Sequence, residues 1–363
     1  MATATVQVPL PDEYLNLDEA ETFRRITYAK DRLGERLLIL GHHYQRDEII
    51  QFADATGDSY KLARHASETT AAEYIVFCGV HFMAESADIL SQPHQAVILP
   101  NIAAGCSMAD MADIADVEEC WEQLTRFGQW LPITYINSAA SLKAFVGKNG
   151  GAVCTSSSAS KALTWGWKQA DRLMFFPDEH LGRNTALHLG VPEEQMVVWD
   201  PRQPLGGNSP EQLKSARLVL WKGYCSVHMR FSVAQIEQAR KRFQGIRVIV
   251  HPECTREVVD AADQYGSTEQ IIKAVEQSEP GGKWAIGTEI NLVHRLAAKH
   301  PDKTIFCLNP TVCVCSTMYR IHPRYLAWAL DNLVAGRIVN RVEVPAETAE
   351  WARVALSRML SLT

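Results

Sequence analysis

The chain has 363 residues, a formal net charge of −6 and 47% hydrophobic residues, which suggests two to three domains with buried cores. It contains no long basic run, so neither nucleic acid nor an anionic membrane is expected as its main partner. Its first dozen residues lack the apolar stretch of a secretory signal, and no apolar run approaches the ~18 residues of a membrane span, which together predict a cytoplasmic protein.

The first third of the chain alternates apolar, strand-like runs with helical patterns. Residues 37–59 begin with an apolar strand that places His42 at its C-terminal end, continue as an amphipathic helix and end in D-x-x-G-D-S, whose last residue is Ser59. A second strand and helix are predicted in 73–90. A third strand leads into the segment AGCSMAD and thus to Cys106.

The middle third repeats this alternation less regularly. Residues 131–145 form a predicted strand with Tyr135 and Asn137 at its polar end, followed by a helix but by no D-x-x-G segment. The run 151–165 passes from apolar through small and polar residues into another helix. A later strand leads to Cys225.

The last third returns to the pattern of the first. Residues 247–268 again begin with an apolar strand, place His251 at its C-terminal end and finish in D-x-x-G-S-T. A strand and helix are predicted in 283–297. A further strand leads into the sequence C-V-C, which contains Cys313 and Cys315.

An internal repeat explains features that strand–helix alternation alone does not. Seventeen positions separate His42 from Ser59, seventeen separate His251 from Thr268, and each third ends in a strand-to-loop cysteine. We therefore predict an α/β fold of three αβα domains with parallel sheets, related by a pseudo-threefold axis around a central active site. The predicted domains are residues 25–115 together with C-terminal helices in 325–363, residues 116–230, and residues 231–324.

Nine cysteines are present, and their odd number in a long chain without an export signal favours free thiols or metal ligands over disulfides. For any single one, a small buried hydrophobe is the simpler interpretation. A threefold arrangement would nevertheless bring one thiolate per domain to a common centre. Three thiolates could hold zinc, or a [4Fe-4S] cluster whose fourth iron stays open as a Lewis acid, and the spacing does not separate the two.

Acid–base groups and hydroxyls also follow the predicted strands. The acid–base groups are His42, Tyr44, His251 and Glu253. The hydroxyls expected near helix N-termini, where free backbone N–H groups can hold a carboxylate or phosphate, are those of Ser59, Ser156, Ser267 and Thr268. Taken singly, each hydroxyl is a helix cap and each histidine a structural residue. Their joint position after strands predicts a small, polyanionic and hydroxylated ligand.

His251 and Glu253 are separated by Pro252 at the end of an apolar strand. In an extended chain, residues two apart point to the same side. We therefore expect the two side chains to form a relay, in which the carboxylate bonds to the imidazole, fixes its tautomer and raises its basicity.

Nine short motifs, in order between about residues 37 and 320, resemble those of quinolinate synthases, enzymes of de novo NAD biosynthesis. The motifs are GHHY, D-x-x-G-D-S, AGCSMADM, TYIN, CTSS, KGYCSVH, HPE, YGST and CSTM. The resemblance implies three similar α/β domains around a [4Fe-4S] cluster, with one cysteine ligand from each domain. It also implies a transferase that condenses iminosuccinate with dihydroxyacetone phosphate to quinolinate, phosphate and water, and a functional link to the enzyme that makes iminosuccinate from aspartate.

The resemblance assigns individual residues as well. The cluster ligands that it implies are Cys106, Cys225 and Cys315, with Cys315 chosen over Cys313 because it stands at the cysteine of C-x-x-M. The substrate-contacting positions that it implies are His42, Ser59, Tyr135, Asn137, Ser156, His228, His251, Glu253, Ser267 and Thr268. The groups that it makes available for proton transfer are Tyr44, Tyr135, His251 and Glu253. The chain departs from the family pattern at His43 and Ser316, and residues 199–212 look like an insertion.

Two other functions are compatible with these residues. A divalent-metal lyase or aldolase could use the same three thiols with a histidine, and analysis of iron and acid-labile sulfide would separate it from a cluster enzyme. A non-enzymatic iron–sulfur sensor or electron carrier would have little use for the strand-end hydroxyls and acid–base groups. An assay for quinolinate formation separates an enzyme from such a carrier.

Overall fold

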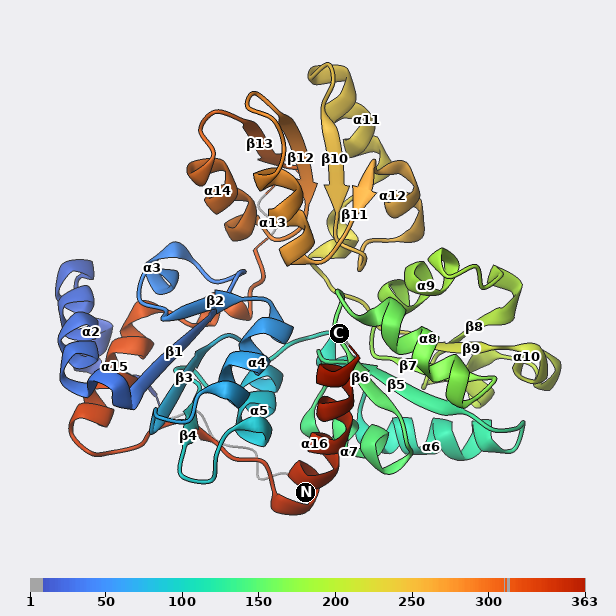
Figure 1. The fold of residues 1–363 in the computed structure, drawn as a ribbon, viewed down its shortest axis with the longest axis horizontal. Coiled ribbons are helices and arrows are strands. Elements are labelled where there is room, and N and C mark those ends of the chain that lie inside the picture. The colour runs from blue at the N-terminus through green and yellow to red at the C-terminus, as the bar shows by residue number, and fades with distance from the viewer. Residues whose placement is uncertain (1–8, 310, 312–313, 363) are drawn as a thin grey trace. The chain divides into compact units, whose positions relative to one another are not determined.

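Three sheets of mostly parallel strands, flanked by helices, make up the part of the chain that the computed structural model describes, residues 9–309, 311 and 314–362 (Figure 1). The chain divides into two units, one with Met1–Cys106 and Cys315–Pro345 and the other with Ser107–Val314 and Ala346–Thr363. The predicted α/β class is confirmed. The arrangement of three domains around a common centre, and their boundaries, stay predictions. Cys313 lies outside the described residues.

The first unit contains a five-stranded sheet in the order β14-β4-β3-β1-β2. Its strands are β1 (Leu37–His42), β2 (Ala55–Gly57), β3 (Tyr74–Cys78), β4 (Ala96–Ile98) and the antiparallel β14 (Arg341–Val342). Its helices are α1 (Asp12–Leu15), α2 (Glu19–Leu33), α3 (Asp47–Ile50), α4 (Ser59–Glu68), α5 (His81–Leu90) and α15 (Pro323–Val334). The apolar run of β1 is buried on both faces, as expected for a parallel strand between layers of helices.

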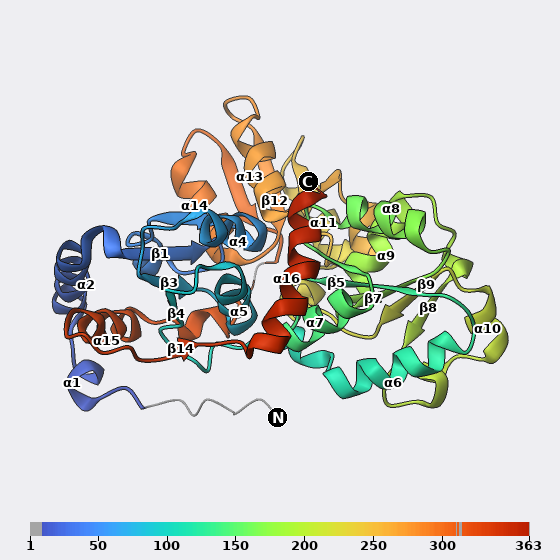
Figure 2. The ribbon, with the colours of Figure 1, turned by 60° about the horizontal axis from the view of Figure 1, so that its bottom comes forward.

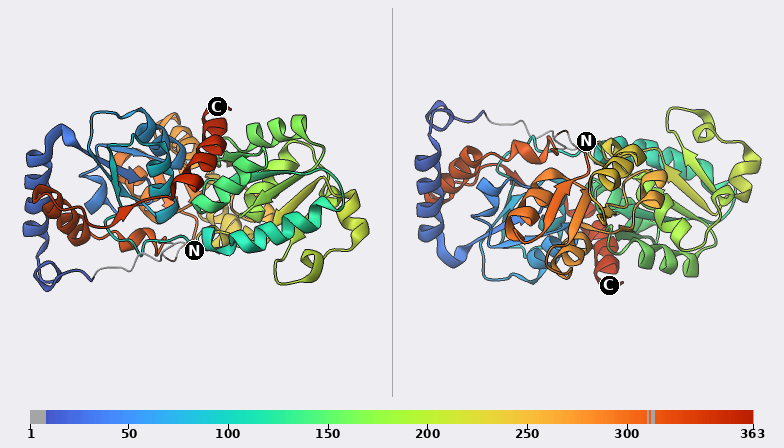
Figure 3. Two further views of the ribbon diagram at one scale, coloured as in Figure 1. Left: turned by 90° about the horizontal axis from the view of Figure 1, so that it is seen from below. Right: turned by 90° about the horizontal axis from the view of Figure 1, so that it is seen from above.

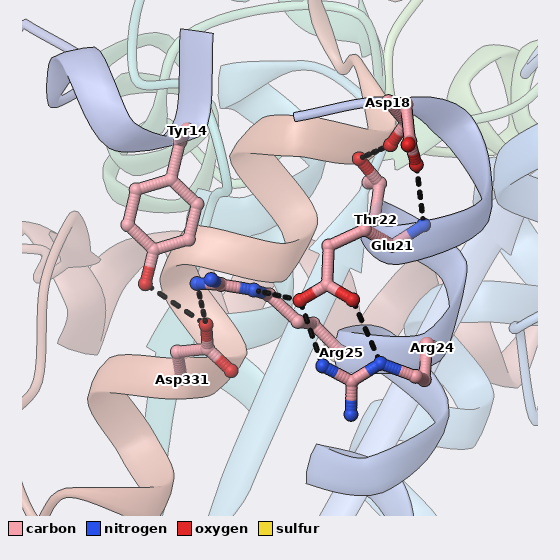
Figure 4. Close-up of polar contacts among 7 residues, drawn as sticks. All are labelled: Tyr14, Asp18, Glu21, Thr22, Arg24, Arg25 and Asp331. Atoms are coloured by element: carbon pink, nitrogen blue, oxygen red, sulfur yellow. Dashed lines mark hydrogen bonds and ion pairs between the residues drawn. The ribbon is translucent and has the colours of Figure 1, made fainter. Parts of the chain in front are cut away.

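Polar contacts join α1, α2 and α15 (Figure 4). Asp18 caps α2 by accepting a hydrogen bond from the backbone N–H of Glu21, at 2.7 Å. The Tyr14 hydroxyl donates to Asp331 Oδ2 at 2.9 Å, and Arg25 Nη1 lies 3.3 Å from the same oxygen. Burial, together with the bond to Asp331, raises the pKa of Tyr14 to about 12. These contacts help to hold α2 and α15 side by side (Figure 3).

The second unit contains two sheets, in the orders β6-β5-β7-β9-β8 and β11-β10-β12-β13. The strands of the first are β5 (Leu131–Tyr135), β6 (Ala152–Cys154), β7 (Leu173–Phe176), β8 (Met196–Trp199) and β9 (Leu218–Trp221). Those of the second are β10 (Arg247–Val250), β11 (Gln264–Tyr265), β12 (Lys283–Gly287) and β13 (Thr304–Cys307).

The helices of the second unit begin with α6, before its first strand, and then largely alternate with its strands along the chain. They are α6 (Ile114–Thr125), α7 (Ala140–Lys148), α8 (Ala159–Gln169), α9 (Glu179–His188), α10 (Pro210–Ser215), α11 (Val233–Arg242), α12 (Arg256–Ala261), α13 (Thr268–Glu276), α14 (Ile290–Lys299) and α16 (Ala346–Ser361). Short 3₁₀ helices in the two units are η1 (Gly34–Arg36), η2 (Ala109–Met111), η3 (Glu193–Gln195), η4 (Pro204–Gly207), η5 (His228–Arg230) and η6 (Met318–Arg320).

All three sheets share one strand order. The strand that opens each repeat (β1, β5 or β10) lies between the short edge strand that follows it in the chain (β2, β6 or β11) and the next strand (β3, β7 or β12). The strands β2 and β11 were not predicted from the sequence, because two or three residues carry too short an apolar run to be recognised. Residues 151–165 follow the opening strand of their third as 73–90 do in the first, but the sheet order makes β6 the counterpart of β2.

The two outer repeats also share a side-chain contact. Asp54 Oδ2 accepts a hydrogen bond from the backbone N–H of Ile39, and Asp263 Oδ2 accepts one from that of Val248, both at 2.7 Å. Each aspartate is the first residue of the D-x-x-G segment, and each acceptor satisfies a backbone donor of the opening strand. The aspartate therefore recurs in the D-x-x-G segments because it satisfies this backbone donor in both repeats.

Helix α16 runs along α7 in the second unit (Figure 2). Gly147 permits this close approach, because a Cβ there would lie 2.0 Å from the carbonyl oxygen of Trp351. Residues 325–363 were all predicted to belong with the first repeat, whereas α16 lies in the second unit. An amphipathic pattern shows that a helix has a face to bury, but it does not show which surface receives that face.

Within the described part of the chain, no helix combines the length and the hydropathy that crossing a lipid bilayer requires.

Candidate active site

Each opening strand ends in two polar side chains that lie two residues apart in the chain. The pairs are His42 with Tyr44 after β1, Tyr135 with Asn137 after β5, and His251 with Glu253 after β10. Hydroxyls follow the edge strands: Ser59 after β2 and Thr268 after β11 each begin a helix, and Ser156 lies two residues after β6. The repeated fold thus presents the same set of positions three times at the C-terminal ends of its strands.

The second unit brings several of these side chains together around Glu253. The Glu253 Oε2 atom lies 2.8 Å from Nδ1 of His228, and Tyr135 donates a side-chain hydrogen bond to the same carboxylate. The imidazole rings of His228 and His251 stack, with centroids 4.4 Å apart and planes inclined by 17°. All four side chains are buried. Three strand-end loops that are distant in sequence therefore meet at one carboxylate.

The side chain of Glu253 does not form the hydrogen bond to His251 that the sequence predicted. Its Oε1 atom lies 3.8 Å from His251 Nδ1, which instead accepts a hydrogen bond from the backbone N–H of Glu253, at 3.3 Å. His42 Nδ1 accepts in the same way from the backbone N–H of Tyr44, at 3.1 Å. Because Nδ1 accepts, a neutral His251 ring carries its proton on Nε2. The backbone fixes the tautomer of His251, and the carboxylate orients His228.

Burial and hydrogen bonding set the charges of this group. Burial lowers the pKa of His251 to about 3, in spite of the nearby charge of Glu253. Burial acts to raise the pKa of Glu253, but the neighbouring His251 and His228 and the hydrogen bonds from His228 and Tyr135 hold it below its usual range. Since His251 is neutral at pH 7, the contacts with His228 and Tyr135 carry this effect there. The site therefore presents a charged carboxylate beside a neutral imidazole.

The hydroxyls of the second unit differ in what they bond. Ser267 caps α13, since its Oγ accepts from the backbone N–H of Gln270 at 3.4 Å, and Thr268 is the first residue of that helix. Ser156 precedes α8, whose N-cap position is Ser158.

The Oδ1 atom of Asn137 is buried and has no hydrogen-bond partner among the described residues. A buried acceptor without a partner is costly, so it marks a point where a ligand donor can bind.

The first unit holds the remaining strand-end residues. The rings of His42 and Tyr44 lie edge to face, with centroids 4.9 Å apart. Ser59 is the first residue of α4, and Asp58 caps that helix by accepting from the backbone N–H of Lys61 at 2.9 Å. Ser59 therefore lies at a helix N-terminus, as predicted, while the aspartate before it makes the cap.

A short 3₁₀ helix begins three residues after each of the three cysteines that the family resemblance selects. The helix η2 follows Cys106, η5 follows Cys225 and η6 follows Cys315. After Cys225 and Cys315, the backbone N–H four residues on also donates to the carbonyl of the cysteine, at 3.1 and 3.0 Å. The shared turn indicates that these three residues occupy equivalent positions of the repeat.

The same three thiols are half-buried, whereas the other described cysteines, Cys78, Cys120, Cys154, Cys254 and Cys307, are buried. Burial raises the pKa of Cys78 to about 12, and it also raises the pKa values of Cys120, Cys154 and Cys254. A metal ligand must be a thiolate. Because these four thiols are buried and have raised pKa values, they are disfavoured as metal ligands.

One cysteine of the three also belongs to a compact donor group. Ligand atoms of Cys225, His228 and Glu253 all lie within 4.8 Å of one another. A thiolate, an imidazole and a carboxylate suit a zinc-type divalent ion, and a thiolate alone suits one iron of a cluster. The donors of the second unit fit either kind of metal centre.

The chain is similar to known proteins of one family. The family model described as "Quinolinate synthetase A protein" matches residues 24–361. Among curated relatives named "Quinolinate synthase", the chain is 57% identical to that of Corynebacterium glutamicum, over 99% of this chain and 92% of the relative. It is 54% identical to those of Acidobacterium capsulatum, over 97% and 95%, and Geobacillus thermodenitrificans, over 97% and 96%.

The chain belongs to the quinolinate synthase family. The resemblance drawn from nine short motifs is thereby confirmed, and it extends over nearly the whole chain. In this member of the quinolinate synthase family, two contacts around Glu253 were not expected from the sequence. Thr288 Oγ1 lies 3.3 Å from His228 Nε2, and Asn184 donates hydrogen bonds to the carbonyls of Pro252 and Cys254. Thr288 follows β12 directly, so a search for polar residues just after predicted strands would have found it. Asn184 lies inside a helix, where no comparable sequence pattern marks it.

Proposed function

We propose that this chain is a quinolinate synthase of de novo NAD biosynthesis, which condenses iminosuccinate with dihydroxyacetone phosphate and releases quinolinate, phosphate and water. Family membership over residues 24–361 is the observation that carries the proposal. The proposal places the protein in the cytoplasm and links it functionally to the enzyme that makes iminosuccinate from aspartate.

The proposal includes a [4Fe-4S] cluster held by Cys106, Cys225 and Cys315. Their partial exposure and the 3₁₀ helix that begins three residues after each of them support this set. When bound, a cluster with three thiolate ligands would supply one open iron as a Lewis acid for a substrate oxygen.

The residues around Glu253 would supply the proton transfers. The charged carboxylate can accept a proton, and its bonds to His228 and Tyr135 hold it in one orientation. His251, with its proton on Nε2, can donate a hydrogen bond to a substrate carboxylate. Asn137 Oδ1 is an acceptor for a substrate N–H or O–H group.

Hydroxyls near helix starts would hold the anionic groups of the substrates. Thr268 begins α13 and Ser59 begins α4, so each hydroxyl lies at the positive end of a helix dipole, where an anionic group is stabilised. Iminosuccinate carries two carboxylates and dihydroxyacetone phosphate carries one phosphate, which accords with the polyanionic ligand expected from the sequence.

The decisive experiment is an assay of anaerobically purified and reconstituted protein with dihydroxyacetone phosphate and freshly generated iminosuccinate. We expect quinolinate and phosphate to form in equal amounts. Omitting either substrate is the control. Protein that contains a full cluster but forms no quinolinate under these conditions would overturn the proposal.

A second candidate is a lyase or aldolase with a single divalent ion, and the Cys225–His228–Glu253 group favours it specifically. Analysis of iron, acid-labile sulfide and zinc in the active protein separates the two. Activity with one equivalent of zinc and no sulfide would establish the second candidate. Activity that follows four equivalents each of iron and sulfide would exclude it.

A further inference from the structure

The side chain of Asn184, inside α9, is buried and forms hydrogen bonds with the backbone around Glu253. Its Nδ2 donates to the carbonyl oxygens of Pro252 and Cys254, each at 2.9 Å. These two carbonyls belong to the residues immediately before and after Glu253. A single amide thus holds the backbone on both sides of the residue that carries the carboxylate.

Helix α9 packs closely against the sheet of the middle repeat. A Cβ at Gly182 would lie 2.6 Å from side-chain atoms of both Leu220 and Phe175, so the helix lies directly on β7 and β9. Asp178 caps the helix, its Oδ1 accepting from the backbone N–H of Leu181 at 2.6 Å. The amide of Asn184 therefore projects from a helix with little freedom to shift.

The same helix also contacts the loop that carries Cys225. The backbone N–H of Glu179 donates to the carbonyl of Gly223 at 2.8 Å, two residues before that cysteine. At its C-terminal side, Glu193 of the following turn pairs with Arg256 at the start of α12. The α9 region thus ties the Cys225 loop and the Glu253 loop to one support.

We propose that Asn184 is a positioning residue for Glu253. By holding the carbonyls of Pro252 and Cys254, it sets the backbone from which the carboxylate reaches His228 and Tyr135. Without these two bonds the loop can relax, and the carboxylate loses its alignment with the reacting groups. This inference rests on the proposed function, because it takes Glu253 as an acid–base group of that reaction.

A double-mutant cycle tests the coupling between the two residues. Asn184→Ala should lower kcat by about 10- to 100-fold with little change in KM, the range that a displacement of about 1 Å at a catalytic group produces. In the Glu253→Gln background the same substitution should lower kcat by less than about threefold, because the aligned group is already lost. An equal loss in both backgrounds, or wild-type kcat for Asn184→Ala, would overturn the inference.

Asn208→Ala is the matched control. Asn208 Nδ2 likewise donates to backbone carbonyls, among them that of Val198 at 2.8 Å, and it lies in the same unit. It should lower the melting temperature about as much as Asn184→Ala while leaving kcat near wild type. Should Asn184→Ala fail to fold, Asn184→Ser, which keeps one donor, replaces it and should show a smaller loss of kcat.

Hydrogen exchange gives a readout that needs no turnover. The backbone amides of His251, Glu253 and Cys254 should exchange faster in Asn184→Ala than in wild type or Asn208→Ala, and unchanged exchange there would contradict the positioning role. If Glu253→Gln slows turnover but Asn184→Ala does not, the inference alone fails. If wild-type protein with a full cluster forms no quinolinate, the proposed function fails, and the exchange experiment still decides whether Asn184 holds this loop.

Discussion

Glu253 is a buried carboxylate that keeps its charge because His228 and Tyr135 donate hydrogen bonds to it. Without such partners, burial would drive a carboxyl group to its neutral form. The same bonds aim the carboxylate and orient His228. At the scale of single residues, the site therefore combines a charged carboxylate with fixed geometry, the two properties that the proposed general base needs.

Replacing Glu253 with glutamine removes this charge and changes little else. Loss of a general acid or base typically lowers the rate by ~10²–10⁴-fold, so kcat of Glu253→Gln should fall by about that range. Cluster content and melting temperature should stay near wild type, because the amide is nearly isosteric and still offers an oxygen to His228. Steady-state kinetics of quinolinate formation measure the effect.

Asp200→Asn is a control for that substitution, since Asp200 is a carboxylate of the same unit that pairs with Lys222 at 2.8 Å, outside the Glu253 group. It should leave kcat within about twofold of wild type. Wild-type turnover of Glu253→Gln, or a melting temperature far below that of Asp200→Asn, would assign Glu253 a structural role.

The buried, neutral His251 predicts a pH dependence of stability. Its pKa is about 3 in the folded protein, while an unfolded histidine titrates near about 6.5. Between these values the unfolded state binds one more proton, so the free energy of unfolding falls as pH falls, by up to about 1.4 kcal/mol per pH unit. Urea unfolding of cluster-free protein at pH 7, 6 and 5 measures the slope.

His251→Asn should flatten that slope, because asparagine binds no proton. His94→Asn, at an exposed position, should leave it as in wild type. Equal slopes for wild type and His251→Asn would show that the imidazole is not held neutral in the folded state.

At the scale of elements, the length of a strand or helix decided whether it could be predicted from the sequence. The long apolar strands and the polar residues at their ends were predicted, since hydrophobic runs and their boundaries are local signals. The edge strands β2 and β11 and the 3₁₀ helices η2, η5 and η6 were missed, because two or three residues carry no periodicity. Hydrogen bonds between loops, such as that of His228 with Glu253, depend on tertiary packing and leave no local pattern.

The close contact of α16 with α7 predicts a strong effect at one glycine. Gly147→Ala would place a methyl group 2.0 Å from the backbone carbonyl oxygen of Trp351, which is not the end of a flexible side chain and cannot rotate away. Overpacking of this kind typically costs about 1–3 kcal/mol, so the free energy of unfolding should fall by that amount. Denaturant unfolding measures it, and limited proteolysis should release the C-terminal helix earlier.

Gly166→Ala in α8 provides the comparison. There the added methyl group would lie 3.0 Å from Leu173 Cδ2, which can move, and the gain in helix propensity of up to about 1 kcal/mol offsets the strain. Its stability should stay near wild type. A Gly147→Ala protein as stable as Gly166→Ala would mean that α16 does not pack closely on α7 in solution.

At the scale of the whole molecule, the repeat links sequence to chemistry. The same strand order in three sheets explains why polar pairs and hydroxyls recur near the C-terminal ends of corresponding strands. The sequence predicted the three repeats, but it assigned α16 to the first of them, because the docking surface of a terminal helix is a tertiary property. The motifs carried the ligand assignment, and the repeated turn after each cysteine supports it independently.

The repeat predicts how nine cysteines divide into ligands and bystanders. Replacing Cys106, Cys225 or Cys315 singly with alanine should abolish assembly of the proposed cluster, since each substitution removes one of its three thiolate ligands. Cys78→Ala and Cys154→Ala should retain the cluster, because burial keeps these thiols protonated. Cys313→Ala should retain it as well, since Cys313 stands two residues before the position from which the repeated turn is counted. Visible absorbance with iron and sulfide analysis, after anaerobic reconstitution, measures assembly in all six variants. A cluster that survives in Cys315→Ala and is lost in Cys313→Ala would reverse the assignment in the last repeat and break its equivalence with the other two.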